Sequence, residues 1–257
     1  MGEKVGQFYD VQEFVEEANR TTDLADLSRL LHGVANTFGF DYFALVHHVD
    51  LKLATPEVIR LYNYPNAWTG TIIERGYFSD DPMHAACQRS AVGFLWSEVS
   101  RIIELNTRQK EILEAAVYAG MGEGFTIPAH VPGEYNGSCS FGVRYGRDVA
   151  VEALPAAQYI GCFAFEAARR IRLISELNKT PGAKAIARGL TPRQMDCIVL
   201  AAKGKSDVDI AQLLGISAPT VHQHIETAKR RYGVATRMQL VVRVLFDSQL
   251  TFADIMR

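Results

Sequence analysis

The chain of 257 residues contains 48% hydrophobic and 22% charged residues, proportions that are typical of packed globular domains and exclude a disordered chain. Its formal net charge of −2 combines two opposite parts. From Pro181 onward there are 11 Lys and Arg against 6 Asp and Glu, whereas residues 1–180 contain 16 against 23. A basic module suited to polyanionic DNA therefore follows an acidic module.

The chain lacks the sequence features of export and of membrane insertion. Its first twenty residues include acidic side chains and no apolar signal-peptide core, and no run approaches the roughly 18 apolar residues of a membrane helix. We expect a cytoplasmic protein without a membrane partner. The cysteines lack paired spacing, which favours reduced thiols over disulfides or zinc. They are Cys87, Cys139, Cys162 and Cys197. We expect neither a metal site nor a resident cofactor.

The first 177 residues alternate between helical and strand-like patterns. Amphipathic periodicity predicts helices at 10–37, 66–75, 82–90, 107–119 and 154–177, and strands from Phe40 and at 58–64, 124–131 and 138–146. This order favours an α+β domain, an α/β/α sandwich with a central antiparallel sheet. Such a sheet can hold a pocket beneath one helical layer. Pro181 and Gly182 then predict a linker at 178–189 between domains 1–177 and 190–257.

Residues 64–97 concentrate aromatic side chains around an acidic residue. The cluster surrounds the Asp81-Pro82 step and consists of Tyr64, Trp68, Tyr77, Phe78, Phe94 and Trp96. Tyr and Trp combine a large apolar body with one polar group, so they suit a mostly apolar ligand that has a few polar atoms. Composition alone leaves a plain aromatic core as the alternative. Asp81 also suits the N-cap of a helix that begins at Pro82.

Other residues with chemical potential have simpler interpretations. His47 and His48 are neighbours in a predicted strand and point to opposite faces, so at most one can line a pocket. Ser138 and Ser140 alternate in a strand and lack the strand-turn-helix elbow of a serine hydrolase. We identify no catalytic residue.

Residues 204–234 are typical of a helix-turn-helix. The first helix is predicted at 207–214 and ends at Gly215, a residue that readily adopts the left-handed conformation. Ser217 suits the N-cap of the second helix, and Pro219 suits its first turn. A 3.6-residue period marks the buried stripe, which consists of Val221, Ile225, Ala228 and Tyr232.

The opposite face of the second helix is polar. Gln can bond adenine, Arg can bond guanine, Glu can accept from cytosine, and flanking basic residues suit phosphates. An ordinary amphipathic surface helix would also be polar there. The candidate DNA-binding residues are Thr220, His222, Gln223, Glu226, Thr227, Lys229 and Arg230.

Residues 188–250 closely resemble the DNA-binding domain of LuxR-type transcription regulators, which implies an all-α domain of four helices with the third as reader. Matching positions include Thr191, Gly204, Ile210, Gly215 and Val221, with Thr220, Val234 and Arg237. Two residues depart from the family pattern: Gln194 replaces a usual Glu, and Ile198 replaces a usual Leu. In addition, His222 and Glu226 stand where basic residues are frequent.

The motif YPxxW, then DP, then W, followed by GxTIP, looks like the autoinducer-binding domain of quorum-sensing LuxR regulators. The resemblance implies a PAS/GAF-like sandwich that binds an N-acyl-homoserine lactone. On the matching positions, Trp68 would donate to the lactone carbonyl and Asp81 would accept the amide N–H. Tyr64 with Ser140 would address the acyl carbonyl, and Trp96 would pack over the lactone ring. The shape-setting positions are Pro82 and Gly124.

Ile72 replaces a Tyr that is common at this family position. The change makes the predicted wall more apolar, which favours a branched, aromatic or otherwise unusual acyl chain.

The resemblance predicts a ligand-gated homodimer on a near-palindromic operator, with RNA polymerase as a further candidate partner. The helix at 154–177 and the helix near 239–246 are the expected dimer contacts. The predicted contact residues of the first are Ile160, Phe163, Ala167, Ile171 and Ile174. A sensor of haem, flavin or another small molecule is the alternative. A lactone-processing enzyme would need a nucleophile or metal-bound water that the sequence lacks.

Overall fold

The computed structural model describes residues 2–49, 58–179 and 189–256. Within these, contacts between Cα atoms divide the chain into two compact units, one built mainly from residues up to Glu176 and one from Leu177 onward. Most of the linker expected at 178–189 lies outside the described residues, because these resume only at Gly189.

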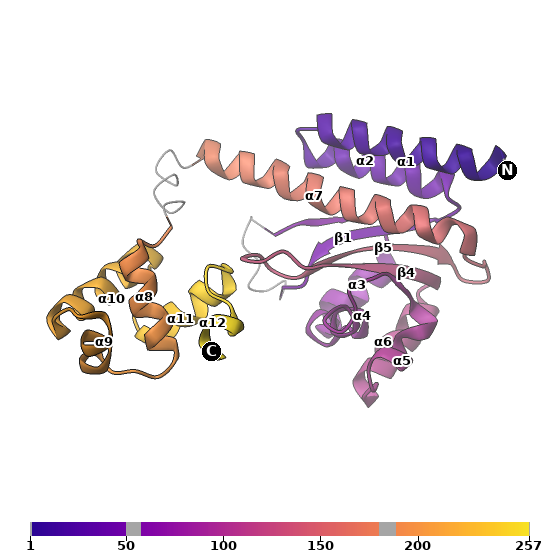
Figure 1. The fold of residues 1–257 in the computed structure, drawn as a ribbon. Helices are drawn as coiled ribbons and strands as arrows, with labels where there is room; N and C mark the ends of the chain where they lie inside the picture. Colours follow the sequence, from indigo (N-terminus) through magenta and orange to yellow (C-terminus); the bar gives the residue numbers. More distant parts are fainter. Residues whose placement is uncertain (1, 50–57, 180–188, 257) are drawn as a thin grey trace. The chain divides into compact units, whose positions relative to one another are not determined.

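The N-terminal unit contains a five-stranded antiparallel sheet of order β2-β1-β5-β4-β3. Its strands are β1 (Tyr42–His47), β2 (Arg60–Tyr62), β3 (Phe94–Leu95), β4 (Met121–Ala129) and β5 (Gly137–Arg144). One face carries α1 (Gly2–Arg20), α2 (Leu24–Thr37) and α7 (Leu154–Lys179) (Figure 1). The other carries α3 (Asn66–Arg75), α4 (Pro82–Cys87), α5 (Val99–Ile102) and α6 (Thr107–Tyr118) (Figure 1). The predicted sandwich is confirmed.

Strand alternation assigns side chains to the two helical layers. On β5, Phe141 contacts Phe40 at a ring-centroid distance of 5.3 Å, and Cys139 lies close to Gly161 of α7. Ser138 and Ser140 point to the opposite face and border a cavity. Because helices cover both faces, Gly137–Val143 of β5 are all buried.

The N-terminal helices differ from the prediction in detail. The helical region expected at 10–37 is two helices, because Asp23 interrupts it and N-caps α2 by accepting from the amides of Ala25 and Asp26. The strand β3 and helix α5 were not predicted. With two and four residues, these elements are too short to display a periodic pattern.

The apolar stripe of α7 corrects the first expected dimer contact. Ile160, Ala167 and Ile171 are at most 6% exposed and belong to the core of their own unit. Phe163 and Ile174 remain 42% and 47% exposed. A periodic apolar stripe identifies a buried face without identifying its partner, and here most of the stripe covers the sheet.

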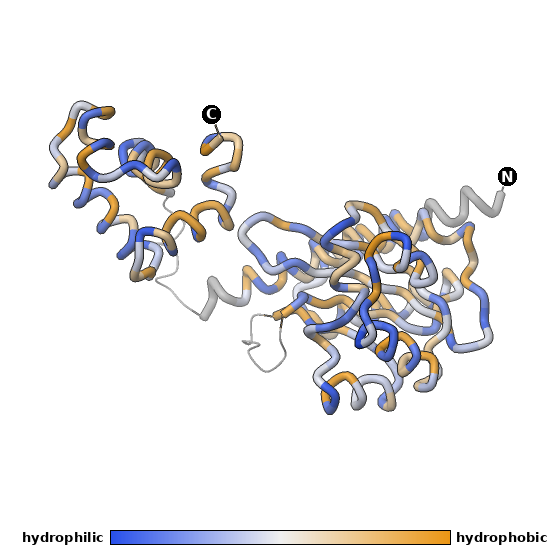
Figure 2. The backbone as a smooth tube through the Cα atoms, turned by 90° about the horizontal axis from the view of Figure 1, so that it is seen from below, coloured by the Kyte–Doolittle hydropathy of each residue, from blue (hydrophilic) through white to orange (hydrophobic). Residues whose placement is uncertain are grey.

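The C-terminal unit is all α-helical (Figure 1). Its helices are α8 (Pro192–Ala202), α9 (Asp207–Leu214), α10 (Ala218–Tyr232), α11 (Arg237–Phe246) and α12 (Phe252–Met256). Four were expected, and α12 is an additional single turn. Hydrophobic and hydrophilic residues alternate along these helices (Figure 2). Buried side chains from α8, α9, α10 and α11 form one core, which includes Ile198, Ile210, Val221, Ile225 and Leu240.

Local signals determine the helix boundaries in this unit. Gly215 ends α9 with a φ of 65°, and Ser217 N-caps α10 by accepting from the amide of Thr220. Gln194, the residue that departs from the family pattern, is buried and completes a capping box with Thr191. A neutral side chain therefore performs the bracing role of the usual acid.

No helix in the described ranges is both long and apolar enough to cross a membrane. Those ranges also contain no cluster of three or more His, Cys, Asp or Glu residues arranged to hold a metal ion.

Candidate functional site

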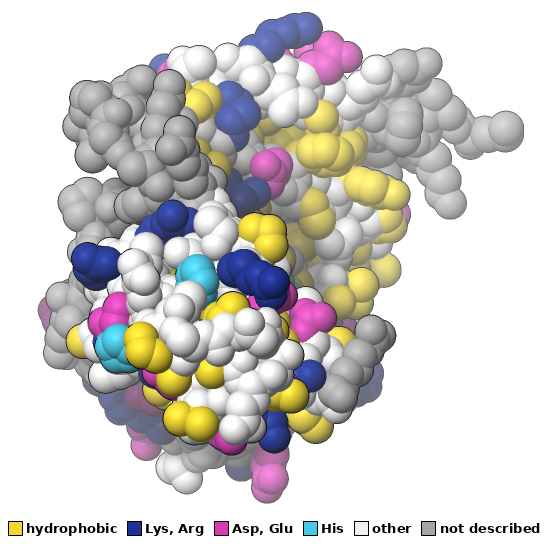
Figure 3. Space-filling view, turned by 60° about the vertical axis from the view of Figure 1, so that its left-hand side comes forward, with side chains coloured by type: hydrophobic (Ala, Val, Ile, Leu, Met, Phe, Trp, Pro, Cys, Tyr) yellow, Lys and Arg dark blue, Asp and Glu magenta, His cyan; other side chains and the backbone are white. Residues whose placement is uncertain are grey.

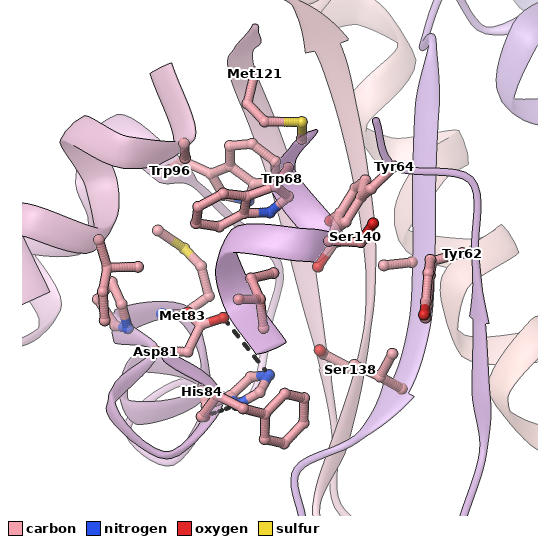
Figure 4. Close-up of a pocket in the computed structure, with 18 of the residues that line it drawn as sticks. Tyr62, Tyr64, Trp68, Asp81, Met83, His84, Trp96, Met121, Ser138 and Ser140 are labelled. Carbon is pink, nitrogen blue, oxygen red and sulfur yellow. Dashed lines mark hydrogen bonds and ion pairs between the residues drawn. The ribbon is translucent and has the colours of Figure 1, made fainter. Parts of the chain in front are cut away.

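A cavity of about 170 Å³ lies between the sheet and the helical layer of α3, α4 and α6 (Figure 4). Its apolar wall comes from side chains of all of these elements, including Ala44, Val46, Ile72, Phe78, Met83, Ile112, Leu113 and Met121. Such a cavity suits a small and largely apolar ligand.

Tyr64, Trp68 and Ser140 bring polar groups to one end of this cavity. Trp68, on α3, is only 6% exposed, and its indole N–H has no hydrogen-bond partner among the described residues. Burial, together with the nearby Asp81 carboxylate, raises the pKa of the Tyr64 hydroxyl, and a hydrogen bond with Ser140 offsets this only in part. The phenol therefore stays neutral and can donate to a ligand carbonyl.

Trp68 is held in place by the contacts around Tyr77. The two rings lie 6.5 Å apart, and Tyr77 is 1% exposed. Arg75 donates to the Tyr77 hydroxyl at 3.1 Å, while the Arg108 guanidinium lies 4.5 Å from the Tyr77 ring centroid. Arg108 also donates to the Arg75 carbonyl at 2.8 Å. These contacts join α3 to α6 and fix the wall that carries Trp68 and Ile72.

Trp96 presents its ring, and not its N–H, to the cavity. Its Nε1 donates to Thr126 Oγ1 at 2.8 Å, and Thr126 Oγ1 lies 2.8 Å from Ser140 Oγ. The indole packs directly on Gly124, where a Cβ atom would lie 2.4 Å from Trp96 Cε2. Gly124 thus sets the shape of the pocket by admitting the ring.

Asp81 N-caps a helix, which confirms one of its two predicted interpretations, and it also lines the cavity. Its Oδ1 accepts from the Met83 amide at 2.8 Å and N-caps α4, in which Pro82 occupies the first turn. Its Oδ2 lies 3.8 Å from His84 Nε2 (Figure 4). One carboxylate oxygen therefore caps the N-terminus of α4, while the other faces His84, which lines the cavity.

His47 and His48 do point to opposite faces of the sheet. His47 packs against Phe165 of α7 at a ring-centroid distance of 5.4 Å. His48 stacks on His84 at 3.8 Å, and its Nε2 lies 2.9 Å from Ser138 Oγ. His48 therefore belongs to the layer that contains the cavity.

The second helix of the helix-turn-helix, α10, exposes His222, Gln223 and Arg230. In Figure 3, Lys, Arg and His side chains are interspersed with hydrophobic and acidic ones on the side of the C-terminal unit that faces the viewer. Two predicted residues are engaged locally: the Thr220 hydroxyl lies 2.7 Å from Ser217 Oγ, and His222 Nδ1 lies 3.4 Å from Asp207 Oδ2. The helix thus has a polar outer face, as the periodicity predicts.

Four candidate residues form two pairs along the same helix. Lys229 Nζ lies 2.7 Å from Glu226 Oε1, and this hydrogen bond holds the pKa of the Glu226 carboxyl below its usual value. Arg230 donates to Thr227 Oγ1 at 3.3 Å. These pairs orient the polar face before any partner is bound.

Two family models match the chain. Residues 23–170 match the Autoinducer binding domain, and residues 188–244 match the Bacterial regulatory proteins, luxR family. The chain is an autoinducer-binding regulator of the LuxR family. As a LuxR-family regulator it has a small-molecule ligand and DNA as partners, and its family consists of transcription regulators, not enzymes.

Relatives of this LuxR-family regulator extend over both domains. The transcriptional activator protein VanR of Vibrio anguillarum is 28% identical over 94% of this chain and 98% of its own length. AhyR of Aeromonas hydrophila is 25% identical over 90% and 88%. The crystal structure of Escherichia coli SdiA has the same fold, with a TM-score of 0.65 at 18% identity, over 95% of this chain and 99% of SdiA.

The pocket of this LuxR-family regulator also contains residues that the sequence analysis did not select. Thr126 does not itself line the cavity but orients the Trp96 ring by accepting its indole N–H, and its alternation with Gly124 along β4 was the available signal. No sequence signal selects the other polar lining residues, which are Arg60, Tyr62, Thr69, His84 and Ser138. They meet only because the sheet pairs distant strands and α4 packs against them.

Proposed function

We propose that this regulator binds an N-acyl-homoserine lactone in the cavity and controls transcription as a homodimer on a near-palindromic operator. One observation carries the ligand proposal: Tyr64, Trp68, Asp81 and Ser140 bring polar groups to a cavity whose wall is largely apolar. In this proposal the lactone is the sole bound small molecule, without haem, flavin or metal.

Each polar group has a complementary atom in such a ligand. The Trp68 N–H donates to the lactone carbonyl, and Asp81 accepts the amide N–H. Tyr64, supported by Ser140, donates to the acyl carbonyl, while the Trp96 ring covers the lactone. A buried polar group left unpaired costs about 1–3 kcal/mol, so these groups disfavour ligands that lack the matching atoms.

Ile72 gives the wall near the acyl group a branched apolar surface where a phenol is common in the family. We propose that the preferred acyl group is branched, aromatic or otherwise unusual. Finding an ordinary straight-chain 3-oxo lactone as the best ligand of a broad panel would contradict this preference.

Thermal unfolding against a panel of lactones tests the ligand. A lactone at 100 times its dissociation constant stabilises the folded state by about 2.7 kcal/mol. For a unit of this size, that corresponds to a rise in Tm of roughly 5–10 °C. The variants Trp68→Phe and Asp81→Asn should reduce the shift. Tyr118→Phe, at a side chain that is 92% exposed, is the matched control.

The absence of a shift with any lactone, in folded protein free of copurified ligand, would overturn the lactone proposal. A second candidate is an acylated molecule without a lactone, because SdiA has been crystallised in complex with octanoyl-rac-glycerol. Its ester carbonyl and hydroxyls can use the same donors. A shift with the acylglycerol alone would support this candidate.

The dimer proposal rests on exposed apolar side chains of two helices. On α7 these include Tyr159 and Phe163, and on α11 they form the stripe Met238, Val242 and Phe246, all at least 40% exposed. Sedimentation of Phe163→Glu and Val242→Glu should show weaker self-association. Unchanged dimerisation in the double variant would exclude both surfaces.

We further propose that α10 reads DNA in the major groove. A two-fold dimer then requires half-sites roughly 34–36 Å apart. Gln223→Ala should relax base preference at one position of each half-site in a binding selection, whereas the exposed Gln212→Ala on α9 is the matched control. Contact with RNA polymerase is the proposed route from binding to transcription, which transcription with purified polymerase can test.

A further inference from the structure

The cavity has a second polar end. Ser138 and Ser140 both face it from β5 (Figure 4), and they are separated by a single residue of the strand. Two residues of a strand span about 6.7 Å. Ser138 and His84 lie at the end away from Trp96 and Met121 (Figure 4). A ligand whose acyl carbonyl meets Tyr64 and Ser140 therefore extends its acyl group past Ser138.

Ser138 is only 2% exposed and has a fixed partner. Its Oγ lies 2.9 Å from Nε2 of His48, whose ring stacks on the cavity-lining His84. His84 is itself held by the Phe78 carbonyl, 3.2 Å from its Nδ1. The hydroxyl is therefore part of a built arrangement of side chains from β5, β1 and α4.

The ring proton of His48 can be assigned from its surroundings. Burial, and then the neighbouring histidines, lower the pKa of His48 to about 2, so its ring is neutral and carries one proton. Its Nδ1 is buried without a hydrogen-bond partner. An orphaned buried N–H is rarer than an unsatisfied acceptor, so the proton belongs on Nε2 and is donated to Ser138 Oγ.

Ser138 then has its own proton to donate. A serine hydroxyl carries one donor and two acceptor sites, and the His48 N–H occupies one acceptor site. Cys87 also contacts Ser138, but burial raises the pKa of the Cys87 thiol, and a neutral thiol sulfur is a weak acceptor. The contacts of Ser138 within the described residues give its O–H no strong acceptor, so the cavity is the side from which a ligand can supply one.

We propose that the acyl group of the ligand carries an oxygen that accepts a hydrogen bond from Ser138. This oxygen is attached to an atom about six bonds beyond the carbonyl carbon, because three bonds of an extended chain span about 3.5 Å. This inference rests on the proposed lactone function. It names the ligand class as lactones with a distally oxygenated acyl group. A 3-oxo or 3-hydroxy oxygen is attached only two bonds from the carbonyl carbon and does not reach Ser138.

Matched ligand pairs test the proposal by calorimetric titration. One pair is heptanoyl- and 7-hydroxyheptanoyl-homoserine lactone. The other is 3-phenylpropanoyl- and 3-(4-hydroxyphenyl)propanoyl-homoserine lactone, in which the para carbon also lies six bonds away. The protein should bind the hydroxylated member of at least one pair about tenfold more tightly. Ser138→Ala should abolish the preference, and Ser140→Ala should weaken both members while preserving their ratio.

Equal affinities within both pairs, with the unhydroxylated lactones binding normally, would overturn this inference and leave the lactone function intact. A preference that survives in Ser138→Ala would also overturn it. Failure of every lactone to bind would refute the proposed function, and the inference with it. The comparison of each ligand pair with the wild-type protein needs no variant, so it tests the inference even if Ser138→Ala folds poorly.

Discussion

Gly124→Ala should destabilise the N-terminal unit through Trp96. The added Cβ would lie 2.4 Å from Trp96 Cε2 and 2.7 Å from the Phe141 carbonyl oxygen, which belongs to the paired strand. The indole can yield only by giving up its 2.8 Å hydrogen bond to Thr126. Overpacking costs about 1–3 kcal/mol and the lost hydrogen bond about 0.5–1.5 kcal/mol. We expect a loss of about 2–4 kcal/mol, or a fall in Tm of roughly 4–16 °C.

Thermal unfolding followed by circular dichroism measures this loss against two other glycines. At Gly142 a Cβ would lie 3.0 Å from Trp96 Cη2, so Gly142→Ala should cost less. At Gly33, within α2, a Cβ would meet nothing within 4 Å, so Gly33→Ala should stabilise by about 0.5–1 kcal/mol. If Gly124→Ala proves as stable as Gly33→Ala, Trp96 is not confined as argued, and the assigned role of Gly124 is wrong.

Three further predictions concern the helix-turn-helix unit and the pH dependence. Gln194→Glu should raise the stability of the C-terminal unit by about 0.5–1 kcal/mol in urea unfolding. The carboxylate of the new Glu side chain would lie in the first turn of α8 and would face Arg231, whose Nη1 lies 3.5 Å from Gln194 Oε1. Arg237→Ala should lower the free energy of unfolding by about 1–3 kcal/mol, because Arg237 donates to Asp207 and to the Lys205 carbonyl at 2.6 Å each. Arg193→Ala is the control: Arg193 forms an exposed ion pair with Asp196, so its loss should cost less than about 0.5 kcal/mol. Folding lowers the pKa of His48 from 6.5 to about 2, so the unfolded chain binds the proton first. The contribution of His48 to the free energy of unfolding should therefore be fully present above about pH 6.5. Below this pH the free energy of unfolding should fall by at most about 1.4 kcal/mol per pH unit, and His48→Asn should reduce this slope in urea unfolding.

The elements best predicted from the sequence are those with local signals. The bounds of α9 were predicted correctly, because Gly215 ends that helix with its own backbone conformation. Likewise, the N-cap Ser217 fixes the start of α10, and α3 begins directly after Pro65. Capping and left-handed glycines act within a few residues, so a single sequence contains the whole signal.

From local patterns alone, the pocket was predictable only where residues are close in sequence; Ser140 was assigned to it through the family resemblance. Trp68, Asp81 and Trp96 occur within one aromatic stretch, whereas Ser138 and His48 are 90 residues apart and meet because β1 pairs with β5. Register of that kind depends on the whole sheet, so local patterns do not contain it.

The ion pair between Glu226 and Lys229 bears on how this regulator searches DNA. A cation that contacts a phosphate releases a condensed counterion, and this release drives sequence-independent binding. The charge of Lys229, whose side chain is 16% exposed, is already offset by Glu226, so a phosphate that contacts Lys229 also meets a negative charge beside it. The reader helix thus gains little from random phosphates, so its residence on non-target DNA should be short and its discrimination should depend more on base contacts.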